Sequence, residues 1–153
     1  MNGKIENIIG SGFLANQFKV HAKLIQKMNI CIYAAGVSNS LCRNKKYLNR
    51  DFNRIKNFIK FLKNQKLVYI STCTIFDPSR NKSEYIKNKI KIEKYIRKKV
   101  SNYKIIRLPE LAGISKNKNT LTNFLYNNII NSKKFVAYAN SKRNLLDVND
   151  AIK

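Results

Sequence analysis

The sequence predicts an α/β protein with a mainly parallel sheet flanked by helices. Short apolar runs of strand length alternate with longer segments whose apolar residues recur at helical spacing. The strongest runs, Ile30–Ala35 and Leu67–Ser71, contain few polar residues, which is typical of strands buried on both faces of a parallel sheet. Two of the runs are followed by glycine, at Gly10 and Gly36, where a strand would turn into a loop.

The first half of the chain predicts two strands and two helices. Lys4–Ile9 ends at Gly10 and predicts the first strand, and Ile30–Ala35 predicts the second. Between them, the apolar spacing from Gly12 to about Lys27 predicts a helix. A second helix is expected at Leu48–Asn64, whose apolar positions are Phe52, Ile55, Phe58, Ile59 and Leu62.

The second half continues the alternation. Leu67–Ser71 predicts a third strand, and the charged segment Ser83–Lys99 predicts a helix with Ser83 as its N-cap. Tyr103–Leu108 predicts a further strand, which Pro109 closes. The remaining expected elements are a helix at Thr120–Asn131, short strands at Phe135–Tyr138 and Leu145–Val148, and a helix start at Asn149–Asp150.

Length and composition indicate one cytoplasmic domain, residues 1–153. A chain of 153 residues with 44% hydrophobic content is long enough to bury a core and too apolar to be disordered. The longest apolar run, Ile30–Val37, is too short to span a bilayer, and the N-terminus lacks the apolar stretch of a signal peptide. A single histidine and cysteines without CxxC spacing argue against a metal site or a hydrolase triad.

The formal net charge of +23 raises the question of nucleic-acid binding. Lys outnumbers Arg 24 to 7, and Lys, Asn and Ile all have AT-rich codons, so genome composition is a sufficient cause. The densest stretch, Lys82–Lys99, interleaves its charges with Ile86, Ile90 and Ile92, which is typical of a solvated helix face. We therefore expect no specific nucleic-acid partner, and a basic nucleic-acid-binding module is the second alternative function.

The order of short motifs resembles the extended short-chain dehydrogenase/reductase superfamily. The motifs are IIGSGFLA, ICIYAAGVSNS, LVYISTCTIFDPS, YIKNK, IIRLPELAG and RNLLDVNDA, between Ile8 and Ala151. They are most similar to the NAD-dependent epimerases and dehydratases that act on nucleotide sugars. The resemblance implies a Rossmann-like fold, NAD or NADP as cofactor, and a nucleotide-sugar substrate. Typical members are about twice this length, so only a remnant of a substrate domain is expected, near residues 114–153.

Residues 10–15, GSGFLA, fit the GxGxxG/A fingerprint of a dinucleotide-binding loop. The first glycine permits a tight turn, the second lets the backbone approach the pyrophosphate, and the small last residue allows close helix packing. A plain strand-to-helix turn is the alternative. The residues that the resemblance places beside the cofactor are Gly10, Ser11, Gly12, Phe13, Leu14, Ala34, Ala35 and Gly36.

The fingerprint also expects an acidic residue about 20 positions further on, to hold the adenosine ribose. This chain has no acidic residue between Glu6 and Asp51. Two explanations remain open: Lys23, Lys27 or Arg43 favours the 2′-phosphate of NADP, or the adenosine half-site is degraded. The second explanation supports the first alternative function, a non-catalytic Rossmann-like protein that binds a nucleotide or a partner.

The resemblance assigns the chemistry to Thr72, Tyr85 and Lys89, with Ser71 as the alternative to Thr72. Thr72 would hydrogen-bond the reacting oxygen, Tyr85 would act as acid and base, and Lys89 would lower the pKa of Tyr85 and hold the nicotinamide ribose. The YxxxK spacing puts Tyr and Lys on one helix face. The same spacing recurs at Tyr95/Lys99 and Tyr138/Lys142, but only Tyr85 begins the helix that follows the STCT segment.

Two further residues resemble family positions that contact the nucleotide sugar. Arg143 opens RNLLDVND, which is similar to the family segment R-D-x-x-H-V-x-D, and its guanidinium suits a diphosphate. Asn123 opens NFLYNN and resembles a family Asn near the same nucleotide. The alternative explanation for both is an ordinary polar side chain in contact with solvent. The resemblance leaves the oligomeric state open, with a homodimer as one option.

Overall fold

The computed structural model describes residues 7–80, 82–115, 117 and 120–153. Four strands form one sheet in the order β1-β2-β3-β4, and every neighbouring pair is parallel. The strands are β1 (Ile8–Ile9), β2 (Ile30–Tyr33), β3 (Lys66–Thr72) and β4 (Tyr103–Leu108). The predicted fold class, an α/β protein with a mainly parallel sheet, is confirmed.

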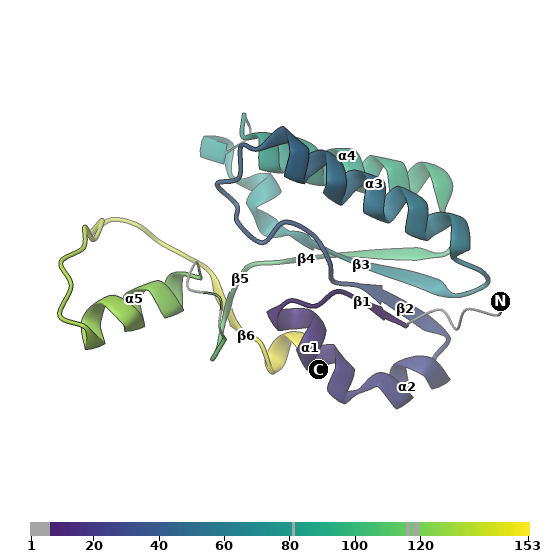
Figure 1. The fold of residues 1–153 in the computed structure, drawn as a ribbon, viewed down its shortest axis with the longest axis horizontal. Helices are drawn as coiled ribbons and strands as arrows, with labels where there is room; N and C mark the ends of the chain where they lie inside the picture. The colour runs from purple at the N-terminus through teal and green to yellow at the C-terminus, as the bar shows by residue number, and fades with distance from the viewer. Residues whose placement is uncertain (1–6, 81, 116, 118–119) are drawn as a thin grey trace.

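Helices cover both faces of this sheet (Figure 1). One face carries α1 (Phe13–Val20) and α2 (Ala22–Lys27), and their apolar residues pack with Ile8 and Ile32 of the sheet. The other face carries α3 (Lys45–Phe61) and α4 (Glu84–Lys99). The core on that side includes Tyr33, Ile55, Leu67, Tyr69, Ile92 and Ile96.

The connection between β1 and β2 differs in hand from the next two. Each successive strand is added on the same side of its predecessor, yet α1–α2 lies on one face while α3 and α4 lie on the other (Figure 1). Crossovers between parallel strands are almost always right-handed, so the α1–α2 connection is the exception. In the doubly wound fold the strand order is 3-2-1-4, and the first helix leads from strand 1 to strand 2. If strands 2 and 3 were absent, that helix would instead lead from strand 1 directly to strand 4 on the other side of strand 1. The α1–α2 connection has this arrangement.

A second, two-stranded sheet belongs to a projection that we call the arm, residues 110–147. Strands β5 (Glu110–Ala112) and β6 (Leu145–Asp147) pair in parallel, and α5 (Leu121–Ile130) lies between them in the chain. The arm extends away from the main sheet beyond the carboxyl ends of its strands (Figure 1). Three short 3₁₀ turns complete the described structure, at Cys73–Phe76, Pro78–Arg80 and Asp150–Ile152.

Several element predictions need correction. The helix expected from Gly12 to Lys27 is divided at His21, whose backbone (φ −102°, ψ 19°) ends α1 and precedes α2. No strand forms at Phe135–Tyr138, because β5 and β6 pair with each other and leave this segment without a strand to hydrogen-bond. The strand β5 was not expected, since three residues are too few for a periodic signal. Residues 4–6 of the first expected strand lie outside the described residues.

The remaining predictions agree with the structure within a few residues. The β4 strand has its expected bounds, and α4 begins after Ser83, whose Oγ accepts a hydrogen bond from the Ile86 amide at 3.1 Å. Helix α5 is capped in the same way by Thr120. Local capping chemistry therefore fixes where these helices begin.

Candidate functional site

The loops after β1 and β2 meet at the carboxyl edge of the sheet. Gly10 has φ +142°, a conformation that residues with a side chain rarely adopt. A Cβ placed on Gly10 would lie 2.7 Å from the carbonyl oxygen of Ala34 and 2.8 Å from the Cβ of Ala15. The fold alone therefore requires glycine at position 10, and this contact brings the GSGFLA and AAG segments together.

Gly12 has no such structural requirement. Its φ of −81° is available to any residue, and a Cβ there would meet nothing within 4 Å. Gly12 is also the N-cap of α1 and supplies no side-chain hydrogen bond to the helix. The first N–H groups of α1 have no partner within the helix, and the positive end of the helix dipole lies there beside Gly12, an arrangement that suits an anion.

The other residues assigned to this loop divide into exposed and inward-facing positions. Ser11 is exposed, whereas Leu14 is buried in the core on the α1 side of the sheet. The ring of Phe13 packs against Gly113, where a Cβ would lie only 2.7 Å from the Phe13 Cζ atom. Phe13 therefore ties the start of α1 to the base of the arm.

A buried ionic cluster lies between α3, α4 and the end of β2. The Lys89 Nζ atom is 3.7 Å from Oδ2 of Asp51, and both side chains are almost fully buried. The same Oδ2 accepts a hydrogen bond from the side-chain Nδ2 of Asn88 at 3.4 Å, and the Lys89 Nζ donates to the Tyr69 hydroxyl at 3.4 Å. A Cβ on Gly36 would lie 3.0 Å from both Asp51 Oδ1 and Lys89 Nζ, so the ion pair lies directly beneath the AAG loop.

Tyr85 borders this cluster and is itself buried. The Lys89 Nζ atom lies 5.6 Å from the centre of the Tyr85 ring. Burial, together with the negative charge of Asp51, raises the pKa of Tyr85 from 10.0 to about 12. Burial lowers the pKa of Lys89, although its pairing with Asp51 opposes this effect. The resemblance expects Lys89 to lower the pKa of Tyr85; here Asp51 offsets the positive charge that would do so.

Thr72 lies at the carboxyl end of β3, as expected, but its hydroxyl already has partners. Thr72 Oγ1 donates to Thr74 Oγ1 at 2.9 Å and accepts from the Thr74 amide at 3.2 Å, which caps the following 3₁₀ turn. The neighbouring Ser71 is buried. Of these two residues, half-buried Thr72 is the more accessible to a ligand.

The three YxxxK pairs differ sharply in environment. Tyr85 and Lys89 are both buried and lie within the ionic cluster. Tyr95 is half-buried while its partner Lys99 is exposed, and Tyr138 on the arm is 79% exposed. Tyr85/Lys89 is therefore the YxxxK pair that the structure brings into contact with the AAG loop.

A second ionic group lies beside the first on α4 and β4. Arg107 donates from Nε to Glu93 Oε1 at 3.0 Å and from Nη2 to Oε2, and Arg97 lies 3.7 Å from the same carboxylate. Burial alone would raise the pKa of Glu93, but the Arg107 hydrogen bonds hold it below its ordinary value. The Arg107 guanidinium also lies 4.9 Å from the ring centre of Phe76.

The sequence interpretation missed Asp51 and Glu93, although a signal for both was present. Asp51 falls between Leu48 and Ile55 at helical spacing, on the side of α3 that is buried. Glu93 follows Ile92 on the buried side of α4. A carboxylate on the apolar face of an amphipathic helix implies a buried cationic partner, because an unpaired buried charge is too costly.

The two residues assigned to the sugar nucleotide lie on the arm. The Asn123 amide donates to the Ser115 hydroxyl at 2.9 Å and to the Asn117 carbonyl at 3.0 Å, so it holds the loop that precedes α5. Arg143 is exposed. Their contact with a substrate stays a prediction.

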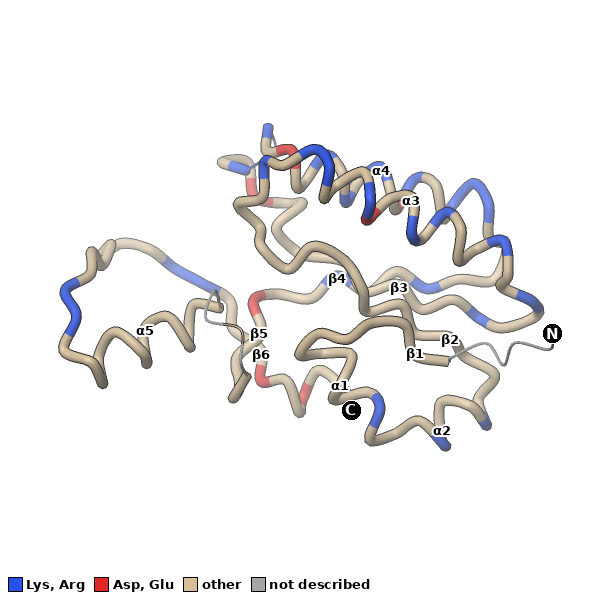
Figure 2. The backbone as a smooth tube through the Cα atoms, in the orientation of Figure 1, with Lys and Arg blue, Asp and Glu red and all other residues tan. Residues whose placement is uncertain are grey.

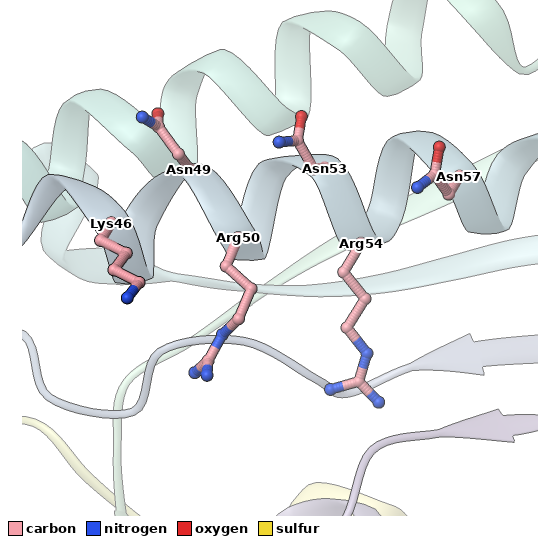
Figure 3. A pocket seen from close by; sticks show the side chains of 6 residues that line it. All are labelled: Lys46, Asn49, Arg50, Asn53, Arg54 and Asn57. Carbon is pink, nitrogen blue, oxygen red and sulfur yellow. The ribbon is translucent and has the colours of Figure 1, made fainter.

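A shallow hollow of about 590 Å³ lies on the exposed side of α3, and none of the site residues predicted from the sequence lines it. Three cations and three amides line it in two rows spaced four residues apart (Figure 3): Lys46, Arg50 and Arg54, and Asn49, Asn53 and Asn57. The cations point toward the loop that follows β2. Such a row suits phosphate groups, but it does not test the nucleic-acid interpretation, which stays a hypothesis.

The described residues offer neither a metal centre nor a membrane-spanning helix. No cluster of three or more His, Cys, Asp or Glu side chains in these residues could hold a metal ion. None of the helices in the same residues combines the length and apolar character needed to cross a membrane.

Comparison with known proteins supports the fold. No family model matches the chain, and no curated protein matches it. Among solved structures it is similar to the capsular polysaccharide assembling protein CapF from Staphylococcus aureus, with a TM-score of 0.60 and 17% sequence identity. The match covers 92% of this chain and 46% of that chain, so this chain spans about half the length of CapF. At this identity the likeness shows the fold alone, a Rossmann-like parallel sheet flanked by helices.

Proposed function

We propose that the chain is an NAD(P)-dependent protein of the epimerase, dehydratase or reductase type that acts on a nucleotide sugar. The observation that carries this proposal is the contact between Gly36 and Lys89. The resemblance assigned Gly36 to the cofactor and Lys89 to the cofactor ribose and the catalytic tyrosine, from segments 53 positions apart. The fold brings these two positions together, and the structural likeness to a capsular polysaccharide assembling protein agrees with sugar-nucleotide chemistry.

In this proposal the chain's residues divide the work between binding and proton transfer. The open turn at Gly12 and the start of α1 would hold the pyrophosphate. The nicotinamide would supply hydride transfer at a sugar carbon. Thr72 would orient the reacting oxygen, Tyr85 would give or take its proton, and Lys89 would hold the ribose. Arg143 and Asn123 would contact the substrate, and the arm would be the remnant of a substrate domain.

The residues fit only part of such a cofactor. The phosphate turn and the AAG loop are present, but β1 is the edge strand of the described sheet, where strands 2 and 3 of the doubly wound fold would lie. No carboxylate follows at the position that holds the adenosine ribose, since residues 7–50 contain no acidic residue. In this proposal the chain would hold the pyrophosphate and nicotinamide side of the cofactor without the carboxylate that usually holds the adenosine ribose.

This partial fit favours a second candidate, a non-catalytic Rossmann-like protein that binds a nucleotide. Two observations support it: the raised pKa of buried Tyr85, and the pairing of Lys89 with Asp51. Both features oppose formation of the phenolate that a tyrosine base requires.

Ligand titration followed by thermal unfolding separates the candidates. A specific ligand adds about 2.7 kcal/mol of stability at a hundredfold excess over its Kd. The enzyme proposal expects NAD or NADP together with a UDP-sugar to raise Tm. It expects Gly12→Val to abolish the cofactor effect while largely sparing the fold of the free protein. A response to nucleotides without turnover would support the second candidate. Unchanged cofactor affinity in Gly12→Val would contradict the assignment of the binding site to this turn under both candidate functions.

A further inference from the structure

The arm differs in composition from the rest of the chain. Residues 111–146 contain six Lys and Arg and no acidic residue. Within this stretch α5 carries no charged side chain at all. Four of the six follow the helix, Lys133, Lys134, Lys142 and Arg143, and Figure 2 shows cations on the loop that returns from α5; the other two lie outside the described residues. The arm therefore combines an uncharged helix with a basic rim.

Several large apolar side chains of the arm are exposed. None of the residues of α5 is buried, and Tyr126, Ile129 and Ile130 are 62%, 65% and 56% exposed. These three lie on one side of the helix because they are three and four residues apart. On the returning segment, Val136 and Tyr138 are exposed to more than three quarters. A patch of this kind on a projecting element marks an interaction surface.

The charge of the arm decides which partner fits this patch. Lys133, Lys134, Lys142 and Arg143 lie on the same returning segment as Val136 and Tyr138. The tyrosines contribute rings with one polar end. Basic and aromatic residues around an exposed apolar face are the composition of segments that insert at the headgroup level of an anionic bilayer. A second copy of the chain fits less well, because it would bring the same cations and a further charge of +23 against them.

We propose that the arm binds the surface of an anionic lipid bilayer, with Tyr126, Ile129 and Ile130 in the headgroup region and the flanking cations against the lipid phosphates. The docking is peripheral and reversible. It requires neither the cofactor nor the Tyr85 site, and it shares only Arg143 with the substrate contacts of the proposed function. It would place the carboxyl edge of the sheet beside the membrane, since the arm projects from that edge (Figure 1).

Co-sedimentation of the full chain with vesicles tests this proposal. Vesicles of phosphatidylcholine with 30% phosphatidylglycerol should bind at least tenfold more protein than phosphatidylcholine alone, and high salt should reverse the binding. The triple variant Tyr126→Ser, Ile129→Ser, Ile130→Ser should lose at least 90% of the binding to the anionic vesicles. It should fold normally, as measured by circular dichroism, because no residue of α5 is buried.

A matched control distinguishes binding through the arm from binding through any exposed apolar side chains of this basic chain. Val20, Leu24 and Met28 on the α1–α2 side are also exposed by more than half, and their triple Ser variant should bind like the parent. Equal losses in the two triple variants would overturn the assignment to the arm, as would binding without preference for the anionic lipid. A lipid-free dimer in sedimentation equilibrium that the arm variant alone dissociates would overturn it in favour of a second copy.

Discussion

The helix pair α3–α4 and the helix α5 show the same local signals of a helix but have opposite surroundings. Both regions are rich in Asn and Ile, and capping chemistry sets the start of each helix. The α3–α4 pair covers a sheet face and buries apolar side chains, an ion pair and Tyr85, whereas no residue of α5 is fully buried. The difference teaches that a helical pattern predicts a helix, while only the partner surface decides whether that helix stabilises the fold or remains free for binding.

The largest expected effect lies in the α3–α4 region and concerns turnover. If the chain is an enzyme, Tyr85→Phe should reduce kcat about 10²–10⁴-fold, the range for a positioned acid or base, with little change in stability. Tyr95→Phe is the matched control and should stay near the parent, because its YxxxK partner Lys99 is exposed. The measurement is a paired assay on an identified nucleotide sugar. Equal activity of Tyr85→Phe and the parent would end the catalytic assignment.

The buried ion pair predicts the next largest effect. Asp51→Ala leaves Lys89 buried without its carboxylate, and loss of one partner of a buried pair costs about 3–5 kcal/mol of unfolding free energy. Asp51→Asn should cost less, because the amide can still accept a hydrogen bond. Urea unfolding measures both. Lys153 pairs with Asp150 on the surface, so Asp150→Ala should change stability little. A loss below 1 kcal/mol in Asp51→Ala would show that the pair is not buried in solution.

Apolar truncation compares the two regions directly. Ile96→Ala on α4 removes a fully buried side chain and should cost about 2–5 kcal/mol. Ile129→Ala makes the same chemical change on exposed α5 and should alter stability by no more than about 0.5 kcal/mol. Urea unfolding of the two variants under one condition provides the test. Similar losses would mean that α5 is covered in solution, which would contradict the comparison.

Alkaline pH should destabilise the α3–α4 region through Tyr85. Its pKa in the folded protein is about 12, against an ordinary value of 10.0, so the unfolded chain loses this proton first as the pH rises. The stabilisation is complete below pH 10 and is lost between pH 10 and 12, by about 2–3 kcal/mol. Tyr85→Phe should flatten this part of the profile relative to the parent. An identical slope in both proteins would contradict the raised pKa.

The sequence predicted most of the fold because its signals are local. A strand that is buried on both faces is recognisable as an apolar run, as in Leu67–Ser71. The start of a helix is recognisable from its capping residue, as at Ser83 and Thr120. The divided helix at His21 and the missing strand at Phe135–Tyr138 were not predictable in this way. A strand exists only where another strand pairs with it, and that partner is set by the whole fold.

For the candidate site, the sequence identified residues but not their electrostatics. The motif order located Gly10, Gly12, Tyr85 and Lys89 at loops and on one helix, and their roles remain predictions. Asp51 was missed, although it carries the charge that pairs with Lys89 and raises the pKa of Tyr85. The pKa of a side chain depends on burial and on charges that are distant in the chain, and no local pattern encodes either one.

The sequence by itself determined the α/β class, the positions of the four main strands and the helical character of α3, α4 and α5, because these depend on the spacing of apolar residues and on end-capping side chains. The tertiary structure alone decided the unusual hand of the α1–α2 connection, the union of Asp51 with Lys89 beneath Gly36, and the exposure of α5. Each of these features depends on contacts between segments that are far apart in the chain. Such contacts contribute to the free energy of folding only after the segments have packed together.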